Sequence, residues 1–139
     1  MMSRAAGRPH VERLDAQPWA RTLNIAMKIS IVVAFAVAIF VPLDVLEGKG
    51  MAFRAPFYLL PMAVVPIAWR VRGRRHPYPA LADALIVSPF LVDTLGNALN
   101  FYNSFASTDD VLHFVNWVLL VAGITLLLRR TSLPRLATW

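Results

Sequence analysis

Four long apolar runs constrain this chain more than any other feature of its sequence. They lie at about residues 23–41, 53–69, 80–101 and 110–128. Each approaches the length that a helix needs to cross the hydrocarbon core of a bilayer. Composition agrees, because 58% of the 139 residues are hydrophobic and the mean hydropathy is +0.56, which is above the soluble norm. The sequence therefore predicts an all-α integral membrane protein with four transmembrane helices.

The segments around these runs divide the chain into three parts. We expect residues 1–21 to form a cytoplasmic arm, residues 22–130 a transmembrane domain and residues 131–139 a cytoplasmic tail. The basic arm resembles the start of a signal peptide, but no small-residue cleavage site follows the first run, so we expect that run to remain as a span. The frequent arginine and alanine are compatible with a GC-rich bacterial genome, and we expect the bacterial cytoplasmic (inner) membrane as the location.

The distribution of basic residues predicts the orientation. The chain has 14 Lys and Arg residues, and all but Lys49 and Arg54 fall in the arm, at Lys28, in the loop of residues 70–75 or at the C-terminal end. By the positive-inside rule we expect an antiparallel bundle with both termini in the cytoplasm. The same asymmetry argues against the dual-topology small multidrug transporters, which have a weak charge bias.

Composition also excludes several classes of chemistry. The chain has no cysteine, so thiolate catalysis, zinc–cysteine sites and iron–sulfur clusters are ruled out. Membrane insertion explains the net charge of +6 better than nucleic-acid binding does, so we expect no nucleic-acid partner. We expect no cofactor, with a bound cation or lipid left open. The expected partners are the lipid bilayer and, because wide apolar faces lack assigned neighbours, a homo-oligomer or a larger membrane complex.

Three features of the first three spans carry structural predictions: the prolines of the second span, Lys28 and Asp83. Pro56, Pro61 and Pro66 lie five residues apart in the second span, which predicts a bent helix with unpaired carbonyls; we favour a kinked packing helix over a hinge or a cavity lining. Lys28 is expected to reach back to the cytoplasmic face. Asp83 is expected to cap the third helix or to pair with the arginine cluster.

Polar residues gather where the third and fourth spans approach their connecting loop. Asp93, Asn97 and Asn100 lie at i, i+4 and i+7 and so share a helical face, with Tyr102 at the rim. Depth counted from the loop predicts a ladder between the two helices. Its expected pairs are Asn100 with Asp109 or Asp110, Asn97 with His113, and Asp93 with Asn116 and Trp117. Gly96 is expected to let another backbone come near.

This ladder has two interpretations. Amides and histidines often link membrane helices, and Ser107 to Asp110 resembles a capping box at a helix start, so packing and capping could explain the pattern. A functional interpretation rests on Asp93, about 12 Å inside its helix if that helix ends near Phe101. Together with His113, Asp93 could relay a proton or hold a cation. The candidate metal ligands are Asp93, Asp109, Asp110 and His113, a set that suits a hard cation better than zinc.

The segment from Asp109 to Phe114 reads DDVLHF. This D-xxx-HF spacing, after a segment that ends at Tyr102, resembles the YjdF-like bacterial inner-membrane proteins of unknown function. It is also similar to an element of VanZ-like membrane proteins, a family associated with glycopeptide resistance, although the Asp-Lys that usually begins the element is Asp109-Asp110 here. Either resemblance implies a bacterial membrane family in which Asp109 and His113 are the matching positions.

Two functions follow as expectations. The first is a non-enzymatic accessory or assembly subunit, whose polar seam fixes its own fold and whose apolar faces pack on a membrane partner. The second is a cation-handling or small-ligand-handling protein, or a membrane enzyme, that uses Asp93 and His113. We favour the first, and no serine is placed with a base in an evident triad.

Overall fold

The structure, a computed structural model, describes residues 14, 17–42, 44–74, 77–104 and 107–130. These described residues are helical and contain no strand. Four stretches are long and apolar enough to span a membrane, namely Pro18–Phe40, Met51–Val71, Ala80–Ala98 and Thr108–Arg130. The predicted number and kind of spans are therefore confirmed. The predicted tail and most of the predicted arm lie outside the described residues.

Helix α2 (Pro18–Phe40) begins at a proline, which suits the first turn because its missing N–H would have no partner there. Its buried positions are Ala20, Asn24, Ile31 and Phe35, which lie on one helical face. A short 3₁₀ helix, η1 (Asp44–Leu46), follows after Pro42. Gly48 and Gly50 then take positive φ angles of 73° and 62°, so the chain can turn sharply into the next helix.

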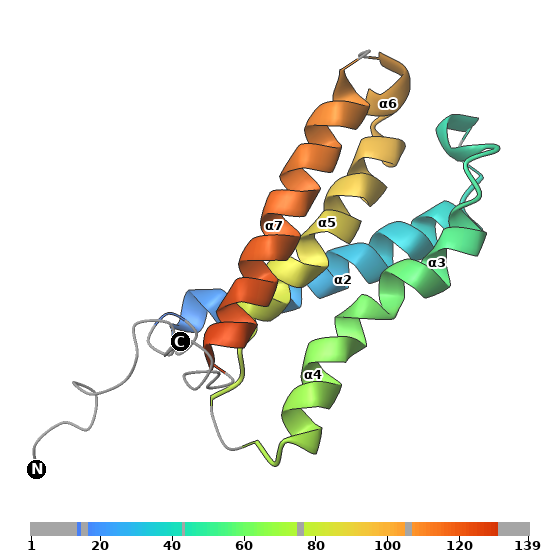
Figure 1. Ribbon diagram of the computed structural model, residues 1–139. Helices are drawn as coiled ribbons and strands as arrows, with labels where there is room; N and C mark the ends of the chain where they lie inside the picture. Colours follow the sequence, from blue (N-terminus) through green and yellow to red (C-terminus); the bar gives the residue numbers. More distant parts are fainter. Residues whose placement is uncertain (1–13, 15–16, 43, 75–76, 105–106, 131–139) are drawn as a thin grey trace, which may run out of the picture.

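The second span is broken in the middle, as the prolines predict. Helix α3 (Met51–Leu59) ends two residues before Pro61, which begins α4 (Pro61–Val71). Figure 1 shows α4 leaving the line of α3 at this point. Pro66 also lacks the N–H that would bind the carbonyl of Met62, and Lys28 Nζ donates to that carbonyl at 2.8 Å instead. The predicted unpaired carbonyl therefore exists, and a lysine satisfies it.

Helix α5 (Ala80–Ala98) is the central element. In the most apolar 18-residue window of α5, 56% of the residues are buried, compared with 6 to 17% in the corresponding windows of the other three spans. Figure 1 shows α2 crossing α5 and α7 (Thr108–Arg130) beside it. Helix α5 ends earlier than predicted, because Asn100 takes a left-handed φ of 57°, which asparagine tolerates well. A short helix, α6 (Phe101–Ser104), then leads to α7.

A close approach at Gly123 holds α7 against α5. A Cβ atom at Gly123 would lie 3.0 Å from both the carbonyl oxygen of Ala82 and the backbone nitrogen of Ile86. The small side chain thus permits near-contact between two helix backbones. At Gly96, where we predicted such an approach, the nearest atoms are the side chains of Leu112 and Tyr102. The predicted close approach was therefore placed at the wrong glycine.

Apolar side chains from α2, η1, α3 and α5 form the hydrophobic core. Its buried members are Ile31, Phe35, Leu46, Met51, Ala55 and Val87. Tyr58 packs on this core, with its ring 5.5 Å from that of Phe35 and 5.4 Å from that of Phe90 in edge-to-face arrangements. Such pairs are favourable beyond simple burial. The core thereby fixes the ring whose hydroxyl reaches the site described next.

The two ends of the helix group differ in charge. Arg70 lies in the last turn of α4, Arg72 and Arg74 follow that helix, and Arg129 and Arg130 end α7; we call this the arginine end. The opposite end carries η1 and α6 (Figure 1). This separation of charge lies along the direction in which the spans would cross a membrane.

Candidate functional site

Asp93 lies at the centre of a polar cluster at the end opposite the arginines. Its Oδ1 accepts a hydrogen bond of 2.5 Å from Tyr102, and its Oδ2 accepts one from Tyr58. Oδ2 also lies 3.3 Å from Asn97 Nδ2 and 3.4 Å from a guanidinium nitrogen of Arg54. Each carboxylate oxygen is thus bound by at least one donor, and the donors come from α3, from α5 itself and from α6.

The position of Asp93 is shallower than predicted. Because α5 ends at Ala98, Asp93 lies about 7.5 Å inside that helix end at 1.5 Å per residue, compared with the predicted 12 Å. This depth lets it meet Arg54 and Tyr102, which both lie near the same end. The left-handed turn at Asn100 is the reason, because it brings α6 and its tyrosine back over the helix end.

Lys49 closes the end of α5. Its ammonium group donates to the carbonyl of Asn97 at 2.8 Å and to Oδ1 of Asn100 at 3.1 Å. Asn97 in turn donates to the carbonyl of Asp93 at 2.9 Å. A cation at a helix C-terminus satisfies carbonyls that have no partner within the helix and complements the helix dipole. Asn97 and Asn100 therefore stabilise the helix end, with Lys49 as their partner.

Tyr102 lies in α6, outside the four spans. Burial and, after it, the hydrogen bond and the negative charge of Asp93 raise the pKa of the Tyr102 hydroxyl above its usual value. A higher pKa means that the hydroxyl keeps its proton. Tyr102 is consequently a hydrogen-bond donor to Asp93 under ordinary conditions.

The predicted ladder between the third and fourth spans is wrong in its pairing. The hydrogen bonds described for Asp93 and Asn97 lead to α3, η1–α3 loop and α6 groups and not to α7. His113 Nδ1 instead lies 3.1 Å from the carbonyl oxygen of Asp109 and 3.3 Å from its carboxylate, and these two side chains are 68% and 69% exposed. Asp110 is exposed as well. The spacing along the sequence did not predict these partners, because they come from other elements or from the same helix.

A groove nevertheless places part of the predicted set side by side. It has a volume of about 270 Å³, and Tyr58 and Asp93 line it together with His113, Asn116 and Trp117 of α7. The prediction that Asp93 lies at the same depth along the bundle as Asn116 and Trp117 is therefore correct. Oδ1 of Asn116 is buried and has no hydrogen-bond partner among the described residues.

The proposed metal set finds no geometric support. Within the described part of the chain, no group of three or more His, Asp or Glu side chains is placed to hold a metal ion. Asp93 is bound by tyrosine and arginine donors. Asp109 and His113 pair with each other at the exposed start of α7.

A second carboxylate, that of the buried Asp83, lies nearer the arginine end. Its side chain is fully buried, and Oδ2 accepts from Tyr78 and lies 2.5 Å from Lys28 Nζ. Both predictions for this pair were wrong: Lys28 turns inward to the protein, and the partner of Asp83 is that lysine. A carboxylate at this depth needs a cation inside the bundle, because the arginines lie beyond the helix end.

The surroundings of Asp83 add a tyrosine and an amide. Burial and the hydrogen bond to Asp83 raise the pKa of Tyr78, which lies in the loop before α5. Oδ1 of Asp83 and Nδ2 of Asn24 are both buried and have no hydrogen-bond partner among the described residues. The neighbouring Ser88 donates to the carbonyl of Leu85 at 2.8 Å, which Pro89 leaves without its usual helical partner.

Sequence reasoning missed the residues that bind both carboxylates. They are Lys28, Arg54, Tyr58 and Tyr78, and the sequence also did not indicate Lys49 as the partner of Asn97 and Asn100. One signal was available, because Arg54 and Tyr58 are the polar members of an i, i+4 pair in an otherwise apolar span. The other contacts join segments far apart in the sequence, which a count along one pair of helices cannot find.

Comparisons with protein-family models, with curated proteins and with solved structures find no match to this chain. The resemblances to YjdF-like and VanZ-like membrane proteins therefore stay predictions. The two positions that carry them, Asp109 and His113, form an exposed pair at the start of α7.

Proposed function

We propose that this chain is a small multi-pass protein of the bacterial cytoplasmic membrane that serves as a non-enzymatic accessory or assembly subunit. In this proposal the four spans form an antiparallel bundle with both termini in the cytoplasm. The arginine end supports the orientation by the positive-inside rule. The bilayer is its solvent, and a second copy or another membrane protein is its partner.

The partners that bind the two carboxylates within the spans support the proposal most directly. Asp93 is held by Arg54, Tyr58 and Tyr102, and Asp83 is held by Lys28 and Tyr78. A carboxylate that already accepts several charge-assisted or hydroxyl hydrogen bonds is a poor ligand for a second cation. Both acids thus act as braces between helices, which is a structural role.

The outer face of α7 supports a partner. This helix buries Gly123 against α5 and leaves Phe114, Val118 and Val121 exposed at i, i+4 and i+7. The same helix exposes the polar pair Asp109 and His113, and polar side chains that face lipid are costly. The exposed face of α2, in contrast, is apolar at Ile25, Ile29, Val32 and Val33 and suits lipid.

A pair of truncations tests the partner. Replacing Phe114 and Val118 with alanine removes the most prominent side chains of the α7 face without adding polar groups. Replacing Ile25 and Ile29 with alanine is the matched control on α2. We expect the particle extracted in mild detergent to exceed the 15.5 kDa of one chain. The α7 variant should reduce it to a single chain, and the α2 variant should not.

Three results would count against the accessory role. The first is a wild-type particle that is a single chain both in detergent and in crosslinked membranes. The second is an equal effect of the α2 and α7 truncations. The third is a large particle in which no second protein chain, of either kind, is present.

The groove beside Asp93 favours one alternative, a small-ligand-handling or cation-handling protein. It holds Asp93, His113 and Asn116, and the buried Oδ1 of Asn116 faces no donor among the described residues. Asp93→Asn and His113→Ala separate the two functions. If both variants accumulate and resist detergent as the parent does while the cell loses a phenotype, the ligand-handling function is supported. If Asp93→Asn loses stability and His113→Ala changes nothing, the accessory role is supported.

A further inference from the structure

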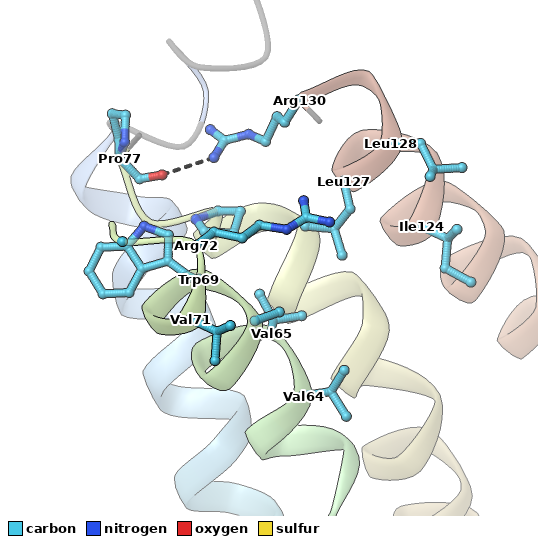
Figure 2. A pocket seen from close by; sticks show the side chains of 13 residues that line it. Val64, Val65, Trp69, Val71, Arg72, Pro77, Ile124, Leu127, Leu128 and Arg130 are labelled. Carbon is cyan, nitrogen blue, oxygen red and sulfur yellow. Dashed lines mark hydrogen bonds between the residues drawn. The ribbon is translucent and has the colours of Figure 1, made fainter. Parts of the chain in front are cut away.

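A second cavity lies at the arginine end and shares no lining residue with the groove beside Asp93. It has a volume of about 760 Å³ and lies between α4 and the last two turns of α7. Figure 2 shows Val64 and Val65 of α4 on one side and Ile124, Leu127 and Leu128 of α7 on the other. This volume is within the range of ordinary ligand pockets, and the apolar lining predicts an apolar occupant.

The break at Pro61 explains why the cavity exists. Helix α3 packs on the core through Met51 and Ala55, whereas α4 buries Val65 among its residues. The change of direction after Leu59 takes α4 away from α7 (Figure 1). Between the two helices a space remains, and apolar residues of two candidate membrane spans form its walls. The second span is therefore kinked, as its prolines predict, and its α4 part also lines a cavity.

Basic groups stand at the mouth of this cavity. Arg72 and Arg130 are both among its lining residues, and Figure 2 shows both guanidinium groups at its arginine end. Arg130 donates to the carbonyl of Pro77 at 3.0 Å, which fixes its side chain beside the opening. Among the described residues that line the cavity none is acidic, so these residues form a positive mouth above an apolar slot.

Aromatic rings mark the level of this mouth. Trp69 lines the cavity, its ring packs edge-to-face on Tyr78 at 5.3 Å, and the guanidinium of Arg74 lies 5.4 Å from the Trp69 ring centre. Tryptophan, tyrosine and arginine gather where the hydrocarbon core meets the lipid headgroups. The apolar slot thus begins at the headgroup level and extends inward.

We propose that this cavity binds an anionic phospholipid, with one acyl chain between α4 and α7 and the phosphate between Arg72 and Arg130. Basic pockets between membrane helices on the cytoplasmic side bind such headgroups. Free phosphate would leave the apolar slot unused, and a zwitterionic lipid would bring its own cation to a mouth that already carries two guanidinium groups. The inference requires that the chain span a membrane, but it does not depend on the accessory role.

The test compares lipids of equal chain length in the purified full chain. Native mass spectrometry from detergent should retain phosphatidylglycerol and release phosphatidylcholine. Phosphatidylglycerol should also raise the unfolding temperature more than phosphatidylcholine does. Arg72→Gln with Arg130→Gln should weaken phosphatidylglycerol binding by about 30-fold, given the usual contribution of two basic residues near an anionic lipid.

Two controls make the result specific. Arg70→Gln with Arg129→Gln removes the same charge from the same two helices, at side chains that do not line the cavity, and should leave the preference for phosphatidylglycerol within about twofold of the parent. Ala68→Phe fills the slot from α4 and should displace the lipid while the arginines remain. Circular dichroism and elution volume establish that each variant is folded; the Ala68→Phe arm decides the question if the arginine pair does not fold.

Several outcomes would overturn the proposal. Equal retention of both lipids would remove the role of the net negative charge of the headgroup. Equal losses in the two double-arginine variants would show a general attraction to the membrane surface. Stabilisation by inorganic phosphate alone, equal to that by phosphatidylglycerol, would remove the acyl chain from the site. Crosslinks between α4 and a second chain in the absence of bound lipid would assign the cavity to a protein.

Discussion

At the scale of single residues, the molecule pairs the half-buried Asp93 and the fully buried Asp83 each with one cation and with at least one tyrosine hydroxyl. Asp93 has Arg54, Tyr58 and Tyr102, while Asp83 has Lys28 and Tyr78. Such a pair is costly to bury and far more costly to break on one side. The two acids should therefore respond strongly to removal of a partner.

The first prediction concerns Asp93. Asp93→Asn keeps the shape but weakens the bonds to Arg54, Tyr58 and Tyr102, so we expect the free energy of unfolding to fall by about 1–3 kcal/mol. The measurement is denaturant-induced unfolding in a fixed detergent mixture, followed by circular dichroism. Asp110→Asn, at an exposed acid, is the control and should change stability by about 0.5 kcal/mol or less. Equal effects at the two positions would refute the bracing role of Asp93.

The second prediction concerns the ion pair of Lys28 and Asp83. Lys28→Met leaves a fully buried carboxylate without its cation, and we expect a loss of about 3–5 kcal/mol. The double variant Lys28→Met with Asp83→Leu should recover most of that loss, because no buried charge remains. Unfolding of the parent, both single variants and the double variant forms a double-mutant cycle. Additive effects would show that the two residues do not act together.

At the scale of elements, the contact between α5 and α7 depends on one glycine. A methyl group at Gly123 would meet the backbone of Ala82 and Ile86, whereas one at Gly96 would meet side-chain atoms of Leu112 and Tyr102, which can shift. Backbone cannot yield as a side chain can, so the two glycines should differ in their tolerance of alanine.

The third prediction follows from this difference. Gly123→Ala should separate α7 from α5 and lower the free energy of unfolding by about 1–3 kcal/mol, and Gly96→Ala should lower it less. Cysteine crosslinking between α5 and α7 provides a second measurement, since the chain has no native cysteine. Gly123→Ala should slow this crosslinking. A larger effect at Gly96 than at Gly123 would contradict the packing described here.

The elements also show how far the sequence can be read. Length and hydropathy predicted four spans, and proline spacing predicted the bend between α3 and α4, because both depend on local chemistry. The end of α5 was placed three residues too late, since a left-handed asparagine at position 100 leaves no hydrophobic signal.

The sequence predicted several residues of the candidate site, but not the partners with which they form hydrogen bonds. Asp93, Asn97, Asn100 and Tyr102 do gather, yet their partners are Lys49, Arg54 and Tyr58 from a different part of the chain. The sequence pattern compared two adjacent helices, whereas an ion pair forms with whichever cation the tertiary packing brings near. The direction in which α7 turns its polar residues depends on the contact at Gly123, which no periodicity in that helix indicates.

At the scale of the whole molecule, charge and shape are organised along one axis. Lys49 and Arg54, the two basic residues at the η1–α6 end, are both committed to contacts with α5. The arginines at the other end follow helix termini. By the positive-inside rule, 12 Lys and Arg residues in the segment up to Lys28, the 70–75 loop and the C-terminal end, against Lys49 and Arg54 in the other loops, favour the arginine end on the cytoplasmic side.

The fourth prediction is the resulting orientation. Since the chain has no cysteine, single-cysteine variants report the side of each exposed position with a membrane-impermeant maleimide. Glu47→Cys and Asn103→Cys lie at the η1–α6 end and should label in intact cells, whereas Arg21→Cys and Arg129→Cys should label after lysis. Each arginine variant removes a single positive charge, so the bias that sets the orientation persists. Labelling in the reverse pattern would invert the proposed topology, and labelling of all four positions in intact cells would show two orientations of one chain. Either result would also move the lipid cavity to the other leaflet, where the arginines at its mouth would face a different set of headgroups.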